Sequence, residues 1–121
     1  MVRCFDDVQQ KHGAIDVCLN AAAYLSDQGT IKDQPVVEFW ASFDIGVKGS
    51  YMVAQQFLRH CAEAGAMLIG VNSLIAHMAA AHVESAPASY ASSKIAVATV
   101  SCTSRWRRRI RTSAVIRCSP A

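Results

Sequence analysis

A tyrosine and a lysine one helical turn apart are the residues of this 121-residue chain best suited to proton-transfer chemistry. Tyr90 and Lys94 stand at the two ends of the segment Tyr-Ala-Ser-Ser-Lys, and residues at i and i+4 project from the same face of a helix. An ammonium beside a phenol favours the phenolate form. Such a tyrosine can exchange a proton with an alcohol or carbonyl oxygen near neutral pH. The spacing alone is common, and two exposed surface side chains are the competing interpretation.

Ser73 is a second candidate because of its place in the chain. It closely follows the apolar run 66–71, which is typical of a buried strand. Side chains at the carboxyl ends of parallel strands face the ligand crevice of an α/β fold. A hydroxyl there can donate a hydrogen bond to the carbonyl oxygen that the tyrosine also approaches. A serine that caps a turn is the competing interpretation.

The apolar periodicity predicts helices and strands in alternation. Steps of three and four along residues 36–64 indicate one long amphipathic helix, whose aromatic side chains we expect mostly to cover a sheet. Continuous apolar runs between the helices favour buried parallel strands. This order predicts an α/β fold with right-handed crossovers and a parallel sheet flanked by helices. The expected helices are 2–12, 36–64 and 89 to at least 100, and the expected strands are 15–19, 66–71 and 113–116.

Charge divides the chain into two parts. Residues 1–104 carry a net charge of −3, whereas residues 105–121 carry +6 from six arginines. We therefore assign a domain to 1–104 and an atypical arginine-rich tail to 105–121. A change of reading frame after about Val100 is our hypothesis for the tail, and an unchanged reading frame through residues 110–115 is the alternative. Nucleic-acid binding by the tail, with Trp106 as a stacking ring, is the weaker interpretation because no surrounding motif supports it.

Several classes of protein are disfavoured by the rest of the sequence. The five cysteines include no CxxC pair, which argues against a disulfide framework or a zinc ribbon and favours the cytoplasm. No apolar run approaches the roughly 18 residues of a membrane span. No metal site is predicted, since His77 and His82 lack a third ligand at useful spacing. We expect His12 and His60 at the surface and Cys18 in the core.

The ordered set of motifs resembles the short-chain dehydrogenase/reductase family. The segment 16–23, DVCLNAAA, is similar to the DVLVNNAG segment at that family's fourth strand. The helix expected over 36–64 is similar to the helix that follows it. Ser73 matches the catalytic serine, and Tyr90 with Lys94 matches the YxxxK pair. The resemblance covers residues 1 to about 100 and implies a partial Rossmann-like, incomplete doubly wound domain.

The resemblance implies a role for each motif residue. Tyr90 would act as general acid and base, Lys94 would favour its phenolate and hold the nicotinamide ribose, and Ser73 would orient the substrate oxygen. The implied reaction is hydride transfer between NAD or NADP and a small carbonyl or alcohol substrate. The residues that would contact the cofactor are Asn20, Ala21, Ala22, Tyr90 and Lys94.

Four departures from the family pattern qualify this prediction. The glycine-rich turn TGxxxGxG, which cradles the pyrophosphate, does not occur in the 121 residues. Gly46 stands where the family has a catalytic asparagine, and Ala23 replaces a glycine near the cofactor. The 17 residues from Ser73 to Tyr90 exceed the usual spacing. We therefore expect weak cofactor binding and impaired turnover by the isolated chain.

The alternative function is a non-catalytic remnant that associates with intact relatives. In the family, the helices corresponding to 36–64 and 89–104 form the subunit interface. The resemblance therefore implies a homo- or hetero-oligomer through these two helices.

Overall fold

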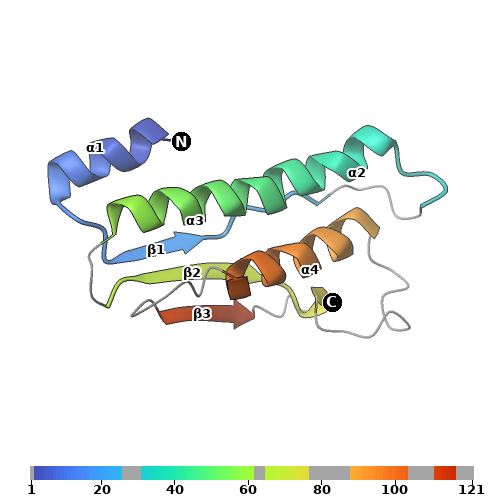
Figure 1. Cartoon of the computed structure of the whole chain (residues 1–121). Helices are drawn as coiled ribbons and strands as arrows, with labels where there is room; N and C mark the ends of the chain where they lie inside the picture. The colour runs from blue at the N-terminus through green and yellow to red at the C-terminus, as the bar shows by residue number, and fades with distance from the viewer. Residues whose placement is uncertain (1, 26–30, 62–64, 77–87, 104–110, 117–121) are drawn as a thin grey trace.

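Alternating helices and strands make up the described part of the chain, as the sequence predicts. The computed structural model describes residues 2–25, 31–61, 65–76, 88–103 and 111–116 (Figure 1). An α/β architecture with a parallel sheet and flanking helices is confirmed. The elements, in chain order, are α1 Val2–His12, β1 Val17–Asn20, α2 Val36–Ser42, η1 Phe43–Lys48, α3 Gly49–His60, β2 Met67–Asn72, η2 Leu74–Ala76, α4 Ala88–Thr103 and β3 Arg111–Ile116.

The three strands form one parallel sheet in the order β1-β2-β3. Val17 pairs with Met67 and Asn20 with Gly70, while Met67 pairs on its other side with Arg111. All three strands point the same way (Figure 1), so their carboxyl ends share one edge of the sheet. The third strand is longer than the predicted 113–116, and the remaining tail residues, 105–110 and 117–121, lie outside the described residues.

The long helix predicted after residue 36 is one helical rod with an irregular centre. Its middle segment, η1, is π-helical, and α3 continues to His60 (Figure 1). A glycine in the interior weakens a regular helix, and Gly46 lies within the π-helical segment. The predicted single helix is therefore confirmed in extent to residue 60 but is not uniform.

Only one face of β1 is covered, which corrects the expectation of a strand buried on both faces. Val17 and Leu19 are 59% and 63% exposed, while Cys18 and Asn20, which alternate with them along the strand, are partly buried. Successive side chains of a strand point to opposite faces. Asn20 contacts α3 through a hydrogen bond, so α3 covers its face and leaves the opposite one open.

The core lies between the helices and the sheet and is small. Phe57 is the fully buried aromatic residue of the described chain, with 0% of its surface exposed. The other buried apolar residues of the described chain are Ala54, Ala66 and Val97. The expectation that most aromatics of the long helix cover the sheet is wrong for Trp40 and Tyr51, which are both largely exposed.

The described helices include none long and apolar enough to cross a bilayer.

Replacing Phe57 by alanine should lower the free energy of unfolding by about 3 kcal/mol, because the cavity forms at the centre of a small core. Chemical denaturation measures the change. Leu58→Ala is the matched control, since Leu58 is adjacent and exposed, and it should cost less than about 1 kcal/mol. Equal losses in the two variants would show that Phe57 is not the principal core residue.

Candidate active site

Ser73 stands in the turn that directly follows β2. Asn72, the last residue of the strand, is buried, and its Oδ1 accepts a 2.9 Å hydrogen bond from the Ser73 backbone N–H. The Ser73 carbonyl accepts a 3.1 Å bond from the N–H of Ala76 and so begins η2. The turn is therefore fixed on both sides of the serine. Its side chain is partly buried at the carboxyl end of the sheet, the place that the sequence predicts.

Lys94 is a buried cation that points toward the end of β2. Its residue is 4% exposed, and its Nζ donates a 3.2 Å hydrogen bond to the carbonyl oxygen of Val71. Burial lowers the pKa of the Lys94 ammonium below its ordinary value, since the charged form loses hydration. Within the described ranges, no carboxylate lies at ion-pair distance from this ammonium. An ammonium has three N–H donors, and the bond to the Val71 carbonyl uses one of them. Lys94 can therefore donate further hydrogen bonds.

Tyr90 lies one turn before Lys94 on α4. The Lys94 Nζ is 5.6 Å from the centroid of the Tyr90 ring, so the two side chains share a face as the i,i+4 spacing predicts. Tyr90 itself is partly buried. The competing interpretation, a pair of exposed surface side chains, does not hold for Lys94.

A hydrogen-bonded asparagine ends β1. The Asn20 Nδ2 donates to the Ser50 Oγ at 3.0 Å, and its Oδ1 accepts from the N–H of Ala22 at 3.3 Å. The amide is thereby oriented from both sides. Ala21 and Ala22, the predicted cofactor neighbours, are exposed beyond the end of the strand, as is the following Ala23.

Close packing of small residues brings α4 against η1. Gly46 is buried, and a Cβ added to it would lie 3.8 Å from the Ser93 Oγ. Ser93 is also buried and donates a 2.9 Å bond to the Tyr90 carbonyl. Gln34 holds the start of α4 through a 2.6 Å bond from its Nε2 to the Ser89 Oγ. A side chain at position 46 would therefore contact Ser93 on α4 from its first carbon onward.

The structure brings α4 to the end of β2. Lys94 bonds to Val71, two residues before Ser73, and α4 packs against both β2 and η2. Asn20 lies at the same edge, since β1 and β2 are parallel neighbours. The segment 77–87, which holds His77 and His82 and most of the long Ser73–Tyr90 connection, lies outside the described residues.

Sequence reasoning missed three residues that shape this edge: Ser50, Asn72 and Ser93. Asn72 carried a local signal, because an asparagine that ends a strand often bonds to the following backbone. Ser50 and Ser93 carried none, since their partners are set by helix packing. Among the residues that the structure describes, no group of histidine, cysteine and carboxylate side chains is placed to hold a metal ion.

A protein-family model matches almost the whole chain. The family model described as enoyl-(acyl carrier protein) reductase matches residues 1–116. No curated protein matches the sequence significantly.

Solved structures share the fold. The enoyl-[acyl-carrier-protein] reductase (NADH) from Aquifex aeolicus VF5 has a TM-score of 0.78 and 14% identity over 93% of this chain and 45% of that one. A short-chain dehydrogenase/reductase from Serratia marcescens BCRC 10948 has a TM-score of 0.71 and 20% identity, covering 82% and 43%. A short chain dehydrogenase from Burkholderia cenocepacia J2315, solved in complex with NADP, has a TM-score of 0.69 and 22% identity, covering 79% and 37%. The chain spans less than half the length of these structures.

Removing the buried charge of Lys94 should stabilise the fold. Because burial lowers its pKa, the folded chain binds this proton less tightly than the unfolded chain, and stability rises as pH increases through the folded pKa toward 10.5. Lys94→Met should raise the free energy of unfolding at about pH 7 by about 1 to 2 kcal/mol, and the gain should shrink near about pH 9.5.

Denaturation of the variant and the unmodified chain at both pH values measures this gain. Lys48→Met is the control, because Lys48 is exposed and pairs with Asp44. A Lys94→Met protein that is less stable than the unmodified chain at neutral pH would contradict the assignment of Lys94 as an uncompensated buried cation.

Proposed function

Because this chain belongs to the short-chain dehydrogenase/reductase family, we propose that its residues carry the acid–base part of an NAD(P)-dependent oxidoreductase site. The observation that carries the proposal is the buried Lys94 ammonium. Keeping a cation in a low-dielectric position costs stability, and the described partners of this ammonium, the Val71 carbonyl and the Tyr90 ring, are both uncharged. Such a cost is typical of a functional site.

In this proposal each motif residue acts on the substrate oxygen or beside it. Tyr90 gives its phenolic proton to the carbonyl oxygen in reduction and takes it from the alcohol in oxidation. Lys94 holds the nicotinamide ribose beside Tyr90. Ser73 donates a hydrogen bond that fixes the substrate oxygen within reach of Tyr90. The substrate class is a small carbonyl or alcohol compound.

The donor set at the end of β2 fits a nicotinamide cofactor. Lys94 has unused N–H donors suited to ribose hydroxyls. The partly buried Asn20 and the exposed Ala21 and Ala22 follow β1 at the same edge of the sheet. Bound NADH or NADPH would supply the hydride in reduction, and NAD⁺ or NADP⁺ would accept it in oxidation. These residues favour neither cofactor over the other, because none of them is a cation placed for the additional phosphate of NADP.

We propose that the 121-residue chain binds this cofactor weakly and turns over poorly. Pyrophosphate binding in such folds depends on a glycine-rich turn at a helix N-terminus, and these 121 residues contain no TGxxxGxG segment.

Free cysteines at positions 4, 18 and 61 support a reducing cytoplasmic location.

Titration of the purified chain with NADPH and with NADH, followed by cofactor fluorescence, tests the site. We expect binding near the millimolar range. Lys94→Met should weaken it roughly tenfold, since a charge-assisted hydrogen bond is lost. Lys48→Met should bind as the unmodified chain does. Equal affinity of the Lys94→Met and unmodified proteins would refute the proposed role of Lys94.

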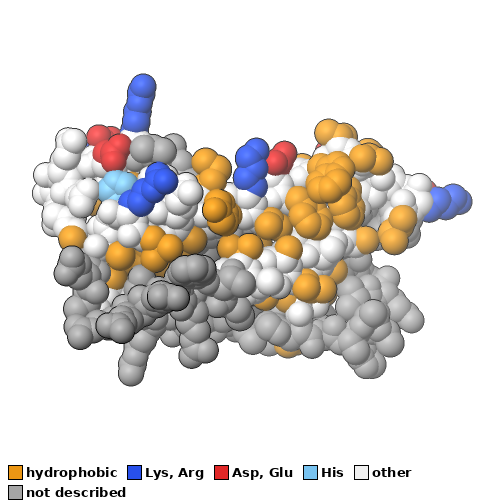
Figure 2. Space-filling model, viewed as in Figure 1, with side chains coloured by type: hydrophobic (Ala, Val, Ile, Leu, Met, Phe, Trp, Pro, Cys, Tyr) orange, Lys and Arg blue, Asp and Glu red, His pale blue; other side chains and the backbone are white. Residues whose placement is uncertain are grey.

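A second candidate function, association with family relatives or with another copy, is supported by the exposed side of the long helical rod. Figure 2 shows hydrophobic side chains gathered over α2, with a lysine and a carboxylate between two hydrophobic areas of the rod. We call this surface the helical ridge. The apolar residues that form it, each at least 37% exposed, are Val37, Trp40, Tyr51, Met52 and Leu58.

The helical ridge is self-complementary in charge about a two-fold axis. Asp44 and Lys48 form a 3.2 Å ion pair at its centre. In an antiparallel pair about a two-fold axis near Gly46, Asp44 of each copy faces Lys48 of the other, and Trp40 faces Met52. Trp40 is 57% exposed yet held at ring distances of 5.5 Å by neighbours on the same rod, Phe39 and Phe43. A rigid exposed tryptophan is a typical interface anchor.

Sedimentation velocity tests the association. We expect a dimer, and Trp40→Ser should weaken it at least about tenfold. Ile31→Ser is the matched control, because Ile31 is an exposed apolar residue outside the helical ridge. A stable, strictly monomeric chain would rule the interface out. An equal effect of Trp40→Ser and Ile31→Ser on association would show that the interface does not lie on the helical ridge.

A further inference from the structure

The first helix is attached to the rest of the fold through very few side chains. Between residues 3 and 12, every residue except Phe5 and Asp6 is exposed. Both of these contact His60, the last residue of α3: the Phe5 ring lies 5.8 Å from the His60 ring, and the Asp6 Oδ1 lies 2.9 Å from its Nε2. The docking of α1 on α3 therefore centres on one histidine.

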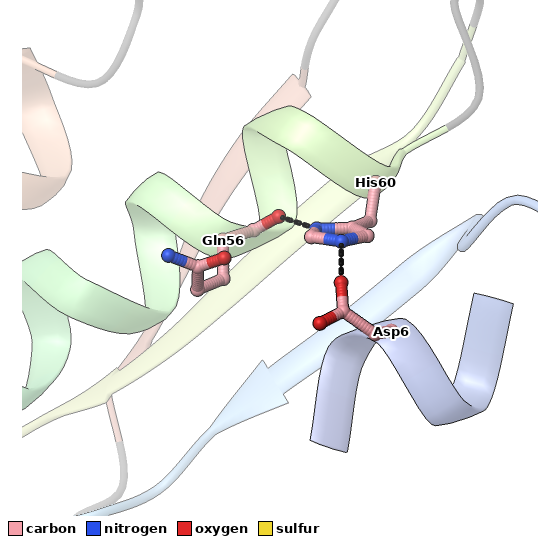
Figure 3. A network of polar contacts seen from close by, with 3 residues as sticks. All are labelled: Asp6, Gln56 and His60. Atoms are coloured by element: carbon pink, nitrogen blue, oxygen red, sulfur yellow. Dashed lines mark hydrogen bonds and ion pairs between the residues drawn. The ribbon is translucent and has the colours of Figure 1, made fainter. Parts of the chain in front are cut away.

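His60 is held by acceptors at both ring nitrogens. Its Nδ1 lies 2.7 Å from the carbonyl oxygen of Gln56, and its Nε2 faces the Asp6 carboxylate (Figure 3). A carbonyl and a carboxylate only accept hydrogen bonds, so both ring nitrogens must carry hydrogen for both bonds to form. The doubly protonated, cationic imidazolium is the form that this geometry requires. His60 is only 8% exposed, which corrects the expectation of a surface histidine.

The ionisable surroundings of His60 are simple in the described ranges. Asp6 of α1 is the acidic group that acts on the ring, and Arg59 of its own helix is the opposing cation. The segment before β1 contributes the Ile15 backbone N–H, which donates to the His60 carbonyl at 3.0 Å, while Asp16 in that segment is exposed. The bond to the Gln56 carbonyl and then the bond to Asp6 raise the pKa of His60, against its desolvation and the repulsion of Arg59.

We infer that Asp6 and His60 form a pH-sensitive clasp, which holds α1 on α3 while the imidazole is protonated and releases it when the proton leaves. When the imidazolium loses a proton, one ring nitrogen keeps only a lone pair. That lone pair faces the oxygen of either the Gln56 carbonyl or the Asp6 carboxylate, so one of the two hydrogen bonds is lost. Gln56 is fixed within α3, whereas α1 has little other buried surface. The contact that yields is therefore the one to Asp6.

The direction of the pH effect follows from the raised pKa of His60. The folded state binds the proton more tightly than the unfolded chain, so the clasp contributes fully below the ordinary histidine value of about 6.5. Its contribution is lost as pH rises through the folded pKa. The clasp lies at the amino-terminal edge of the sheet, opposite the candidate active site, so it can be tested independently of the proposed reaction.

Amide hydrogen exchange of the full chain, corrected for the intrinsic rate at each pH, tests the clasp. Between about pH 6 and about pH 8.5, protection of the α1 amides should fall about tenfold, while β2 amides should keep theirs. Asp6→Asn should show low α1 protection at both pH values, because the carboxylate that favours the imidazolium is gone. Asp7→Asn, an exposed neighbour on the same helix, should retain the pH step.

Two further readouts keep the result interpretable. Tryptophan fluorescence of each variant checks that the remaining fold is intact, and the NMR titration of the His60 Cε1–H should move to lower pH in Asp6→Asn and stay in place in Asp7→Asn. Equal α1 protection at both pH values in the unmodified chain would overturn the clasp. So would an unchanged pH step or an unchanged His60 titration in Asp6→Asn.

Discussion

The hydrogen bond from the buried Lys94 ammonium to the Val71 carbonyl ties the helix that carries Tyr90 to the strand that leads to Ser73. A cation in this position loses its hydration and gains a neutral carbonyl oxygen and the face of the Tyr90 ring, neither of which carries a full negative charge, so its burial is costly for the fold. Packing of α4 against η1, through Gly46 and Ser93, brings the lysine to that strand. The candidate active site therefore depends on close contact between two helices and on the tolerance of one uncompensated charge.

A second constraint is that the described helices cover the sheet incompletely. The side chains of β1 that face α3 are partly buried, whereas Val17 and Leu19 on the other face are open. The core between helices and sheet is correspondingly small and centres on Phe57. The hydrophobic effect scales with the apolar area removed from water, so polar contacts such as the Asp6–His60 pair carry an unusual share of the attachment between elements. This is also why a single histidine can govern the docking of α1.

The agreement between sequence and structure was best where the signal is local and periodic. A helix predicted over 36–64 is present to residue 60, a strand predicted over 66–71 is present at Met67–Asn72, and Tyr90 and Lys94 share a face as their spacing predicts. Predictions of burial were poorer. The expectation that most aromatics of the long helix cover the sheet does not hold for Trp40 and Tyr51, and the surface position expected for His60 is wrong. Burial depends on which other elements lie against a given face. Family membership rested on the order of several motifs, and the match over residues 1–116 supports it.

The sequence by itself determined the kinds and order of the elements and the residues able to transfer a proton, because periodicity and side-chain chemistry are properties of short segments. Only the tertiary structure decided which of those residues are buried and what they contact. Lys94 became a desolvated cation because α4, which carries it, packs against β2 and η2. His60 became an imidazolium through acceptors 4 and 54 residues away in the chain. Such environments arise from contacts between distant segments, and no local pattern encodes them.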